Sequence, residues 1–369
     1  MAGNFETRLQ KLKTRRQGPQ GVVKSEHSMD GQSGSLEESY QKRSTKTATT
    51  YTLGAMQEVD PAYTANSFAE GDRVKNQLEK ALDGVVPVEF DYQGSVPLNI
   101  HIKGVSDIDL LLLRKVFVLI DKTGPLANSP WYSDWEGKSG SSLLAELRTA
   151  AEGILSKAFP EAQVDISGSK AITISGGSLR REVDVIPSHW YDSSEYQRTL
   201  QKKDRGIYIF LKEDQSTARN YPFLHMYYIE EKDKATLGNT KKVIRLLKTL
   251  VADYEEPESI HLSSYDIASL VWHFDSLAIN VPVWRELSLL WSTRVALADM
   301  IVNDQRTRLL ITPDKTRKII DKEVKFTSLR VLLAELDDLI AEVVKELNAG
   351  PFITHDIAQR TLLESFVPS

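Results

Sequence analysis

The chain contains no cysteine, which excludes disulfides, thiolate metal ligands and a cysteine nucleophile. Its chemistry must therefore come from carboxylate, histidine, serine and lysine side chains. A long uncharged apolar run is also missing, because the most apolar stretch, residues 108–120, is interrupted by Asp109, Arg114 and Lys115. No basic segment near the first residue leads into an apolar run, so we expect a cytoplasmic protein that does not enter a membrane.

The chain has no excess of basic residues. Its 46 Lys and Arg against 51 Asp and Glu give a formal net charge of −5. A protein that holds long nucleic acids needs clustered Lys and Arg against the phosphates, so no stable complex with a long nucleic acid is expected. Hydrophobic residues make up 41% and charged residues 26% of the 369 residues, which is typical of a globular protein with one or two domains.

The sequence pattern changes twice along the chain. Residues 1–50 are rich in Ser, Gln, Gly and Thr, and they predict an N-terminal arm that is either mobile or wrapped onto the body. Residues 51–222 alternate between strand and helix patterns and predict one lobe. Residues 223–369 have helical spacing and predict a second, helical lobe.

The first lobe is predicted to be an α+β fold, with a mixed β-sheet flanked by helices. Apolar side chains recur at helical spacing over 67–82 and 142–159. The predicted strands are 86–92, 107–120, 163–166, 171–175, 182–188 and 206–211. In the helical lobe the predicted helices are 235–254, 264–274, 282–301 and 327–347.

Two aspartates stand at the start of the most apolar predicted strand. Asp107 and Asp109 are two residues apart, so strand geometry points both carboxylates to one face. An Asp-x-Asp pair is also common at an exposed strand end or turn. Two carboxylates beside a buried strand would be costly without a cation, however, and Mg²⁺ is often held by one or two carboxylates together with substrate phosphates. We therefore predict a Mg²⁺ site here.

Asp184 is the candidate third ligand. It lies between two valines in a predicted strand and points to the opposite face from them, together with Glu182. A site with two metal ions usually needs a further carboxylate from a neighbouring strand. We predict that Asp107, Asp109 and Asp184 form a catalytic site for two Mg²⁺ ions, with Mn²⁺ as an alternative metal, and that the site transfers nucleotidyl groups.

Gly94 and Ser95 are separated from Asp107 by 11 residues. A glycine lets the backbone approach a phosphate closely, and the following serine offers an amide and a hydroxyl. A Gly-Ser pair alone is a weak signal. Next to the paired aspartates, it predicts a loop that holds the triphosphate of the substrate.

These motifs resemble those of the pol-β-type nucleotidyltransferase superfamily. The helical lobe adds a second match, because NTKKVIRLLK at 239–248 and LSSY at 262–265 are similar to cyclic GMP-AMP synthase, the oligoadenylate synthases and the bacterial CD-NTases of CBASS anti-phage systems. The CD-NTases fit best. The resemblance covers roughly residues 51–300, with ordered motifs in both lobes.

The resemblance implies a bilobal enzyme whose helical lobe completes the nucleotide cleft. It would join ATP and a second nucleotide such as GTP into a cyclic oligonucleotide second messenger, with release of pyrophosphate. CBASS effector and regulatory proteins would be its partners. The family pattern also implies that Lys241 and Ser264 bind the triphosphate and that Tyr265 stacks on the donor base, roles that suit a point charge and a π-face.

The residues of the helical lobe have simpler interpretations too. One stripe of basic residues is typical of the solvated face of an amphipathic helix. It consists of Lys241, Lys242, Arg245 and Lys248. Ser264 is equally suitable as a helix N-cap, and Tyr265 as a core aromatic residue.

Two other functions are compatible with the same motifs. One is a nucleotidyltransferase that modifies tRNA, a protein or an aminoglycoside. The other is a non-catalytic nucleotide-binding or antitoxin-like module that keeps the fold, although the intact set of three aspartates argues against it.

Overall fold

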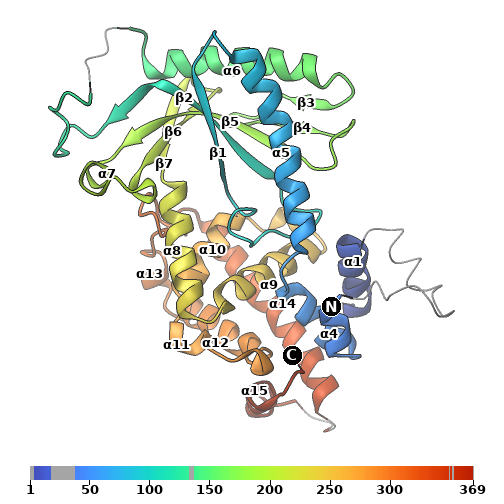
Figure 1. The fold of residues 1–369 in the computed structure, drawn as a ribbon. Helices are drawn as coiled ribbons and strands as arrows, with labels where there is room; N and C mark the ends of the chain where they lie inside the picture. Colours follow the sequence, from blue (N-terminus) through green and yellow to red (C-terminus); the bar gives the residue numbers. More distant parts are fainter. Residues whose placement is uncertain (1–3, 18–37, 133–136, 349, 351–352, 369) are drawn as a thin grey trace. The chain divides into compact units, whose positions relative to one another are not determined.

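The computed structural model describes residues 4–17, 38–132, 137–348, 350 and 353–368. The chain divides into two compact units (Figure 1). The sheet unit contains Asp60–Asn99 and Ser106–Tyr228, and the helical unit contains Met1–Val59, Ile100–Val105 and Ile229–Ser369. Residues 51–59 therefore belong with the helices, although the sequence pattern assigned them to the sheet lobe. Within the described ranges, no helix has both the length and the apolar character needed to cross a membrane.

The sheet unit is built on a seven-stranded mixed sheet. Its path runs β1-β2-β5-β4-β3, and β6 pairs with β5 and with β7. The pairing of β2 with β5 is parallel, and the other pairings are antiparallel. The strands are β1 (Val88–Gln93), β2 (Ile108–Ile120), β3 (Gln163–Asp165), β4 (Ile172–Ser175), β5 (Val183–Asp192), β6 (Gly206–Leu211) and β7 (Ser216–Asn220).

The leucine run of β2 is buried on both faces of the sheet. Leu110 and Leu112 join a core with helices α5 (Pro61–Leu82) and α6 (Gly140–Ala158). Leu111 and Leu113 belong to a second core, formed with residues of β5 and β6. Because successive strand residues point to opposite faces, a strand covered on both sides becomes continuously apolar.

Local signals in the sequence set the ends of the two covering helices. The Asp60 carboxylate caps α5 by accepting from the Ala62 amide, and Pro61 occupies the first turn, where its missing N–H costs nothing. Ser139 caps α6 by accepting from the Ser142 amide. Short helices follow β5, namely α7 (Ser194–Thr199) and a 3₁₀ turn at Lys202–Asp204.

The helical unit is assembled from segments far apart in the sequence. Helix α4 (Thr47–Met56) packs against α1 (Phe5–Gln17), α9 (Asn239–Asp253) and α14 (Glu323–Leu347). Helix α8 (Pro222–Ala235) begins in the sheet unit and ends here. The other helices are α3 (Ser39–Arg43), α10 (Ser264–Trp272), α11 (Ser276–Ile279), α12 (Ser288–Val302), α13 (Asp304–Thr307) and α15 (His355–Glu364), with 3₁₀ turns at Pro257–Ser259 and Val283–Arg285.

The predicted α+β class is confirmed, and all six predicted strands are present with small shifts at their ends. The predicted helix at 282–301 is wrong at its start, because a 3₁₀ turn precedes α12 and the α-helix begins at Ser288. The predicted N-terminal arm contains α1, α3 and the start of α4 among its described residues, whereas its residues 18–37 lie outside them.

Candidate active site

Asp109 and Asp184 are adjacent across the parallel pair of β2 and β5, where they are direct partners in the register. Both side chains are half-buried. Because side chains alternate along a strand, the two carboxylates lie on the same face as Leu111 and Ile186, opposite the face that α5 and α6 cover. Asp107 is exposed and precedes the first residue of β2, so the strand itself holds only one acid of the Asp-x-Asp pair.

Thr173, which belongs to none of the predicted motifs, holds the Asp184 carboxylate. Thr173 of β4 is its partner on the other side of β5, and the Thr173 hydroxyl donates to Asp184 Oδ1 at 2.5 Å. Burial raises the pKa of Asp184, and the bond from Thr173 opposes that rise. Burial also raises the pKa of Glu182, and the charges of Asp184 and Asp165 add to the effect. The only signal in the sequence was a polar residue within the Ile-Thr-Ile run of β4.

The loop after β1 comes directly against Asp109. Gln93, the last residue of β1, pairs with Asp109, and Gly94 follows with φ +83°. A Cβ atom on Gly94 would lie 2.0 Å from Asp109 Oδ2, so a side chain there would displace the Asp109 carboxylate. Ser95 follows, half-buried. The structure therefore brings Gly94, Asp109 and Asp184 together in the sheet unit.

The carboxylate pair is suited to Mg²⁺. Asp109 and Asp184 offer the hard oxygen ligands that this ion prefers, and one or two carboxylates commonly hold it together with substrate phosphates. Among the described residues, no group of three or more His, Asp or Glu side chains is arranged to hold a metal ion. The pair fits a site that the substrate phosphates complete.

Lys241 lies in the first turn of α9, in the helical unit. Its ammonium donates to Glu230 Oε1 at 2.6 Å and lies 3.9 Å from an oxygen of Asp233, while its amide donates to Asp233 Oδ1 at 2.8 Å. The side chain is only 14% exposed. The carboxylates of Glu230 and Asp233 therefore hold the Lys241 ammonium at the start of α9.

The alternative of a solvated basic stripe on α9 is wrong. Arg245 is buried and donates to the Met56 carbonyl, and burial lowers its pKa to about 10. Lys248 is also buried, and its ammonium donates to the Ile100 carbonyl at 2.9 Å. These two cations therefore tie α9 to other segments of the helical unit and do not face solvent.

Ser264 and Tyr265 begin α10, also in the helical unit. The alternative of Ser264 as N-cap is wrong, because Ser263 caps the helix and forms a capping box with Asp266. Ser264 is exposed at the first helical position, and Tyr265 is half-buried. The Arg317 guanidinium lies 5.3 Å from the centre of the Tyr265 ring.

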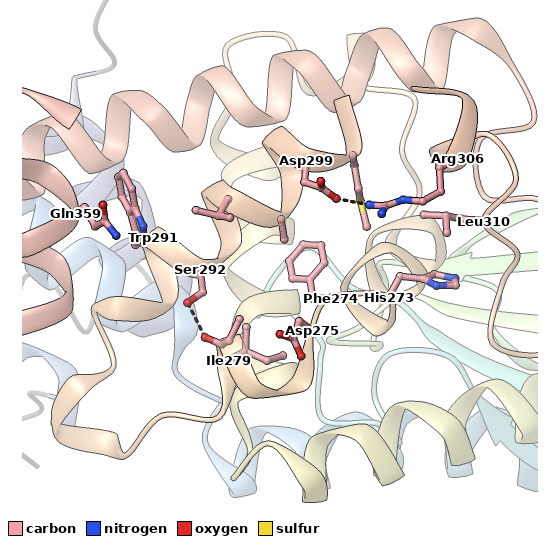
Figure 2. Close-up of a pocket in the computed structure, with 14 residues that line it drawn as sticks. His273, Phe274, Asp275, Ile279, Trp291, Ser292, Asp299, Arg306, Leu310 and Gln359 are labelled. Atoms are coloured by element: carbon pink, nitrogen blue, oxygen red, sulfur yellow. Dashed lines mark hydrogen bonds and ion pairs between the residues drawn. The ribbon is translucent and has the colours of Figure 1, made fainter. Parts of the chain in front are cut away.

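A cavity of about 620 Å³ lies elsewhere in the helical unit (Figure 2). Phe274 and Trp291 line it with other apolar side chains, and the ion-paired Asp299 and Arg306 stand at one side. None of the predicted site residues lines it.

Comparison with known proteins gives the family. The cyclic dinucleotide synthase CdnE of Yersinia aleksiciae is 39% identical over 363 residues, which are 94% of each chain. A c-di-GMP synthase of Capnocytophaga granulosa is 32% identical over 310 residues, 78% of this chain and 85% of that protein. The solved structure of a STING-associated CdnE c-di-GMP synthase from C. granulosa matches with a TM-score of 0.71 at 27% identity, covering 94% of this chain and all of that one. No family model matches.

The nucleotidyltransferase resemblance read from the motifs is thereby confirmed, and the general product class narrows from a cyclic oligonucleotide to a cyclic dinucleotide. The chain belongs to the CdnE family of cyclic dinucleotide synthases, the CD-NTase nucleotidyltransferases that make second messengers for anti-phage signalling.

Proposed function

We propose that this chain condenses two nucleoside triphosphates into a cyclic dinucleotide at Asp109 and Asp184, with Asp107 as the third acid. The observation that carries the proposal is the register of β2 and β5, which sets the two carboxylates side by side next to Gly94. An acidic pair of this kind, beside a loop that admits a close backbone approach, suits a metal-bound triphosphate.

The three aspartates would hold two Mg²⁺ ions, which neutralise phosphate charge and lower the pKa of an attacking hydroxyl when they are bound. The chain itself supplies the oxygen ligands and their orientation. The Thr173 hydroxyl fixes one oxygen of Asp184, as outer partners of metal ligands commonly do. The Gly94 backbone and the Ser95 amide and hydroxyl are assigned to the donor phosphates.

Each round of the reaction forms one phosphodiester bond. A ribose hydroxyl oxygen of the acceptor attacks the α-phosphorus of the donor, the bond to pyrophosphate breaks, and the hydroxyl proton passes to solvent. A second round within the linear product closes the ring and releases a second pyrophosphate. Holding both reactants in line is the main contribution expected from the protein.

The activities of the relatives support a choice of nucleotide substrates and of a partner protein. Because two relatives that are more than 30% identical are c-di-GMP synthases, we assign GTP as a substrate and c-di-GMP as the first expected product, with ATP as the alternative second nucleotide. The similar structure described as STING-associated supports a STING-type receptor as the CBASS effector that binds the product. Because nucleoside triphosphates are cytoplasmic metabolites, the reaction is assigned to the cytoplasm.

The test is to incubate the protein with all four ribonucleotides and Mg²⁺, and to analyse the products by mass spectrometry after alkaline phosphatase treatment. We expect a phosphatase-resistant cyclic dinucleotide, no product with EDTA, and none from the Asp109→Ala/Asp184→Ala variant. Label transferred to tRNA, protein or an aminoglycoside would instead support the modifying enzyme. A wild-type protein without Mg²⁺-dependent nucleotide binding would support the non-catalytic module.

A further inference from the structure

A pocket of about 390 Å³ lies within the sheet unit, at the last residues of β2. Strand β1 pairs with β2 only as far as Arg114, so residues 116–120 of β2 extend beyond it. This extension forms one wall of the pocket, and Tyr132, Tyr196 and Arg205 line the rest. The end of β2 that β1 leaves uncovered therefore borders a cavity.

The pocket is separate from the carboxylate pair of the candidate active site. Val116, the first pocket residue of β2, lies seven residues along the strand from Asp109. At about 3.3 Å per residue, this spacing places the pocket roughly 20 Å from that carboxylate. A ligand in the pocket would therefore not occupy the position proposed for the metal-bound triphosphate.

One carboxylate and two aromatic rings hold Arg205 in this pocket. Its Nε donates to Asp192 Oδ1 at 2.6 Å, and the other oxygen of Asp192 accepts from the Tyr132 hydroxyl at 2.8 Å. The guanidinium carbon lies 4.2 Å from the centre of the Trp190 ring and 5.1 Å from that of Tyr196, within the range of cation–π contacts. The orientation of the guanidinium is thus set before any ligand arrives.

The two terminal nitrogens of Arg205 are available to a ligand. Within the part of the chain that the structure describes, Nε is the only nitrogen of this guanidinium with an acceptor. The Arg205 side chain is 21% exposed, whereas that of Asp192 is only 6% exposed. A guanidinium presents its donors in a planar fork that matches the two oxygens of a carboxylate. The pocket therefore presents a fixed pair of donors to an anionic group.

The remaining walls of the pocket are aromatic and apolar. Phe117 is buried in one wall, whereas Val116 and Trp131 line the pocket with 57% and 66% of their surface exposed. Large apolar side chains that gather in the open beside a pocket mark a binding surface. The volume is in the range of small-molecule sites, which combine apolar walls with a few fixed polar groups. A suitable ligand therefore carries a flat apolar body as well as an anionic group.

We propose that this pocket binds a small aromatic carboxylate, with its oxygens on the terminal nitrogens of Arg205 and its ring against Phe117 and Trp131. A single negative charge is favoured over a phosphate dianion, because Asp192 already balances the charge of Arg205 and repels a second negative charge. This site goes beyond the proposed function, since its chemistry needs neither a metal ion nor a nucleotide.

The experiment uses three probes with one ring system, namely 2-naphthoate, the neutral 2-naphthamide and the dianionic 2-naphthyl phosphate. Dissociation constants are measured by ligand-observed NMR titration of the full chain. Arg205→Gln removes the charge, Arg205→Lys keeps the charge without the fork, and Trp131→Ala removes the exposed ring. The matched control is Arg198→Gln, at an arginine of α7 that is 59% exposed. Thermal unfolding of each variant checks the fold.

We expect the wild type to bind naphthoate about tenfold more tightly than either other probe. Arg205→Gln should weaken naphthoate binding roughly tenfold and lose the preference over naphthamide, and Arg205→Lys should recover part of both. Trp131→Ala should weaken naphthoate and naphthamide equally, by about threefold, because only ring contact is lost. Arg198→Gln should match the wild type.

Equal affinities of the wild type for naphthoate and naphthamide would overturn the proposal, and so would a preference for naphthoate that survives in Arg205→Gln. Tighter binding of naphthyl phosphate would overturn the assigned ligand class. If Arg205→Gln does not fold, Trp131→Ala keeps the test decisive, because its exposed side chain leaves the pair of Asp192 and Arg205 intact. Unchanged binding of naphthoate by Trp131→Ala would then overturn the site.

Discussion

Asp109 and Asp184 are direct partners across parallel strands, so two carboxylates face the same space at the start of β2 and β5. Neighbouring negative charges repel. Burial raises the pKa of Asp184, which shows that its charged form is costly here. A structure that keeps both acids here gives up stability that apolar residues would provide. A divalent cation offsets that cost and gives the pair its chemistry.

Replacing either acid should therefore lower the activity without lowering the stability of the fold. Asp109→Asn and Asp184→Asn are each expected to lower pyrophosphate release at least about a hundredfold, because a metal ligand is lost. The thermal midpoint should stay equal or rise, because a half-buried charge is removed and an asparagine oxygen still accepts from Thr173. The matched control is Asp165→Asn, an exposed acid of β3 in the same sheet. A variant of the pair that keeps full activity would contradict this site.

Gly94 offers a second comparison. Gly94 and Gly84 both have positive φ, +83° and +70°, so alanine strains the backbone at either position. Only at Gly94 does the new Cβ meet a side chain, Asp109 Oδ2 at 2.0 Å, whereas at Gly84 nothing lies within 4 Å. Gly94→Ala should lose most of its pyrophosphate release and Gly84→Ala should keep it, with each variant destabilised by about 1–2 kcal/mol in chemical denaturation. Similar activities in the two variants would mean that the contact with Asp109 has no functional effect.

The strands and their acids were predictable because both depend on local pattern. The leucine run of β2 and the isolated acid of β5 are readable from alternation, and most of helix α5 is readable from helical spacing over 67–82. The first turn of α5, with its cap at Asp60, was not predicted. The sequence also indicated that Gly94 matters for the site. It did not show that a side chain at this position would meet Asp109.

Features that depend on distant segments could not be predicted. Helix α4 is rich in threonine, a poor helix former, and nine of its ten residues are buried, so tertiary packing determines its structure. Thr173 and Arg317 act on residues 11 and 52 positions away, respectively. The burial of Arg245 and Lys248 likewise depends on segments near residues 56 and 100, which no helical periodicity of α9 encodes.

Lys241 and its neighbour Lys242 should differ in their effect on nucleotide binding. Lys241 is held between Glu230 and Asp233, whereas Lys242 pairs with Glu286 at 3.1 Å. We expect Lys241→Ala to raise the KM for nucleotide and the inhibition constant of tripolyphosphate roughly tenfold, equivalent to about 1.4 kcal/mol. Lys242→Ala is the control and should change neither constant. Equal effects of the two substitutions would assign Lys241 a structural role only.

His189 should make the protein unstable in mild acid. It is fully buried in β5 between the rings of Phe117 and Tyr208, and burial lowers its pKa from 6.5 to about 4. Between these two pH values the unfolded chain binds a proton that the folded chain excludes, so stability falls as the pH decreases from 6.5 to 4. Above pH 6.5 the imidazole is neutral in both states and has no effect.

The loss attributable to His189 should reach about 3 kcal/mol at pH 4. Urea unfolding between pH 7 and pH 4 measures this loss. The free energy of unfolding is plotted against pH for the wild type and for His189→Asn, which has no titratable ring, and the two slopes are compared. The variant should be less stable at pH 7, since it loses ring packing, and should lose less stability on acidification. His355→Asn, at a side chain that is 62% exposed, is the control and should follow the wild-type profile. Parallel profiles for the wild type and His189→Asn would show that protonation of His189 is not coupled to unfolding.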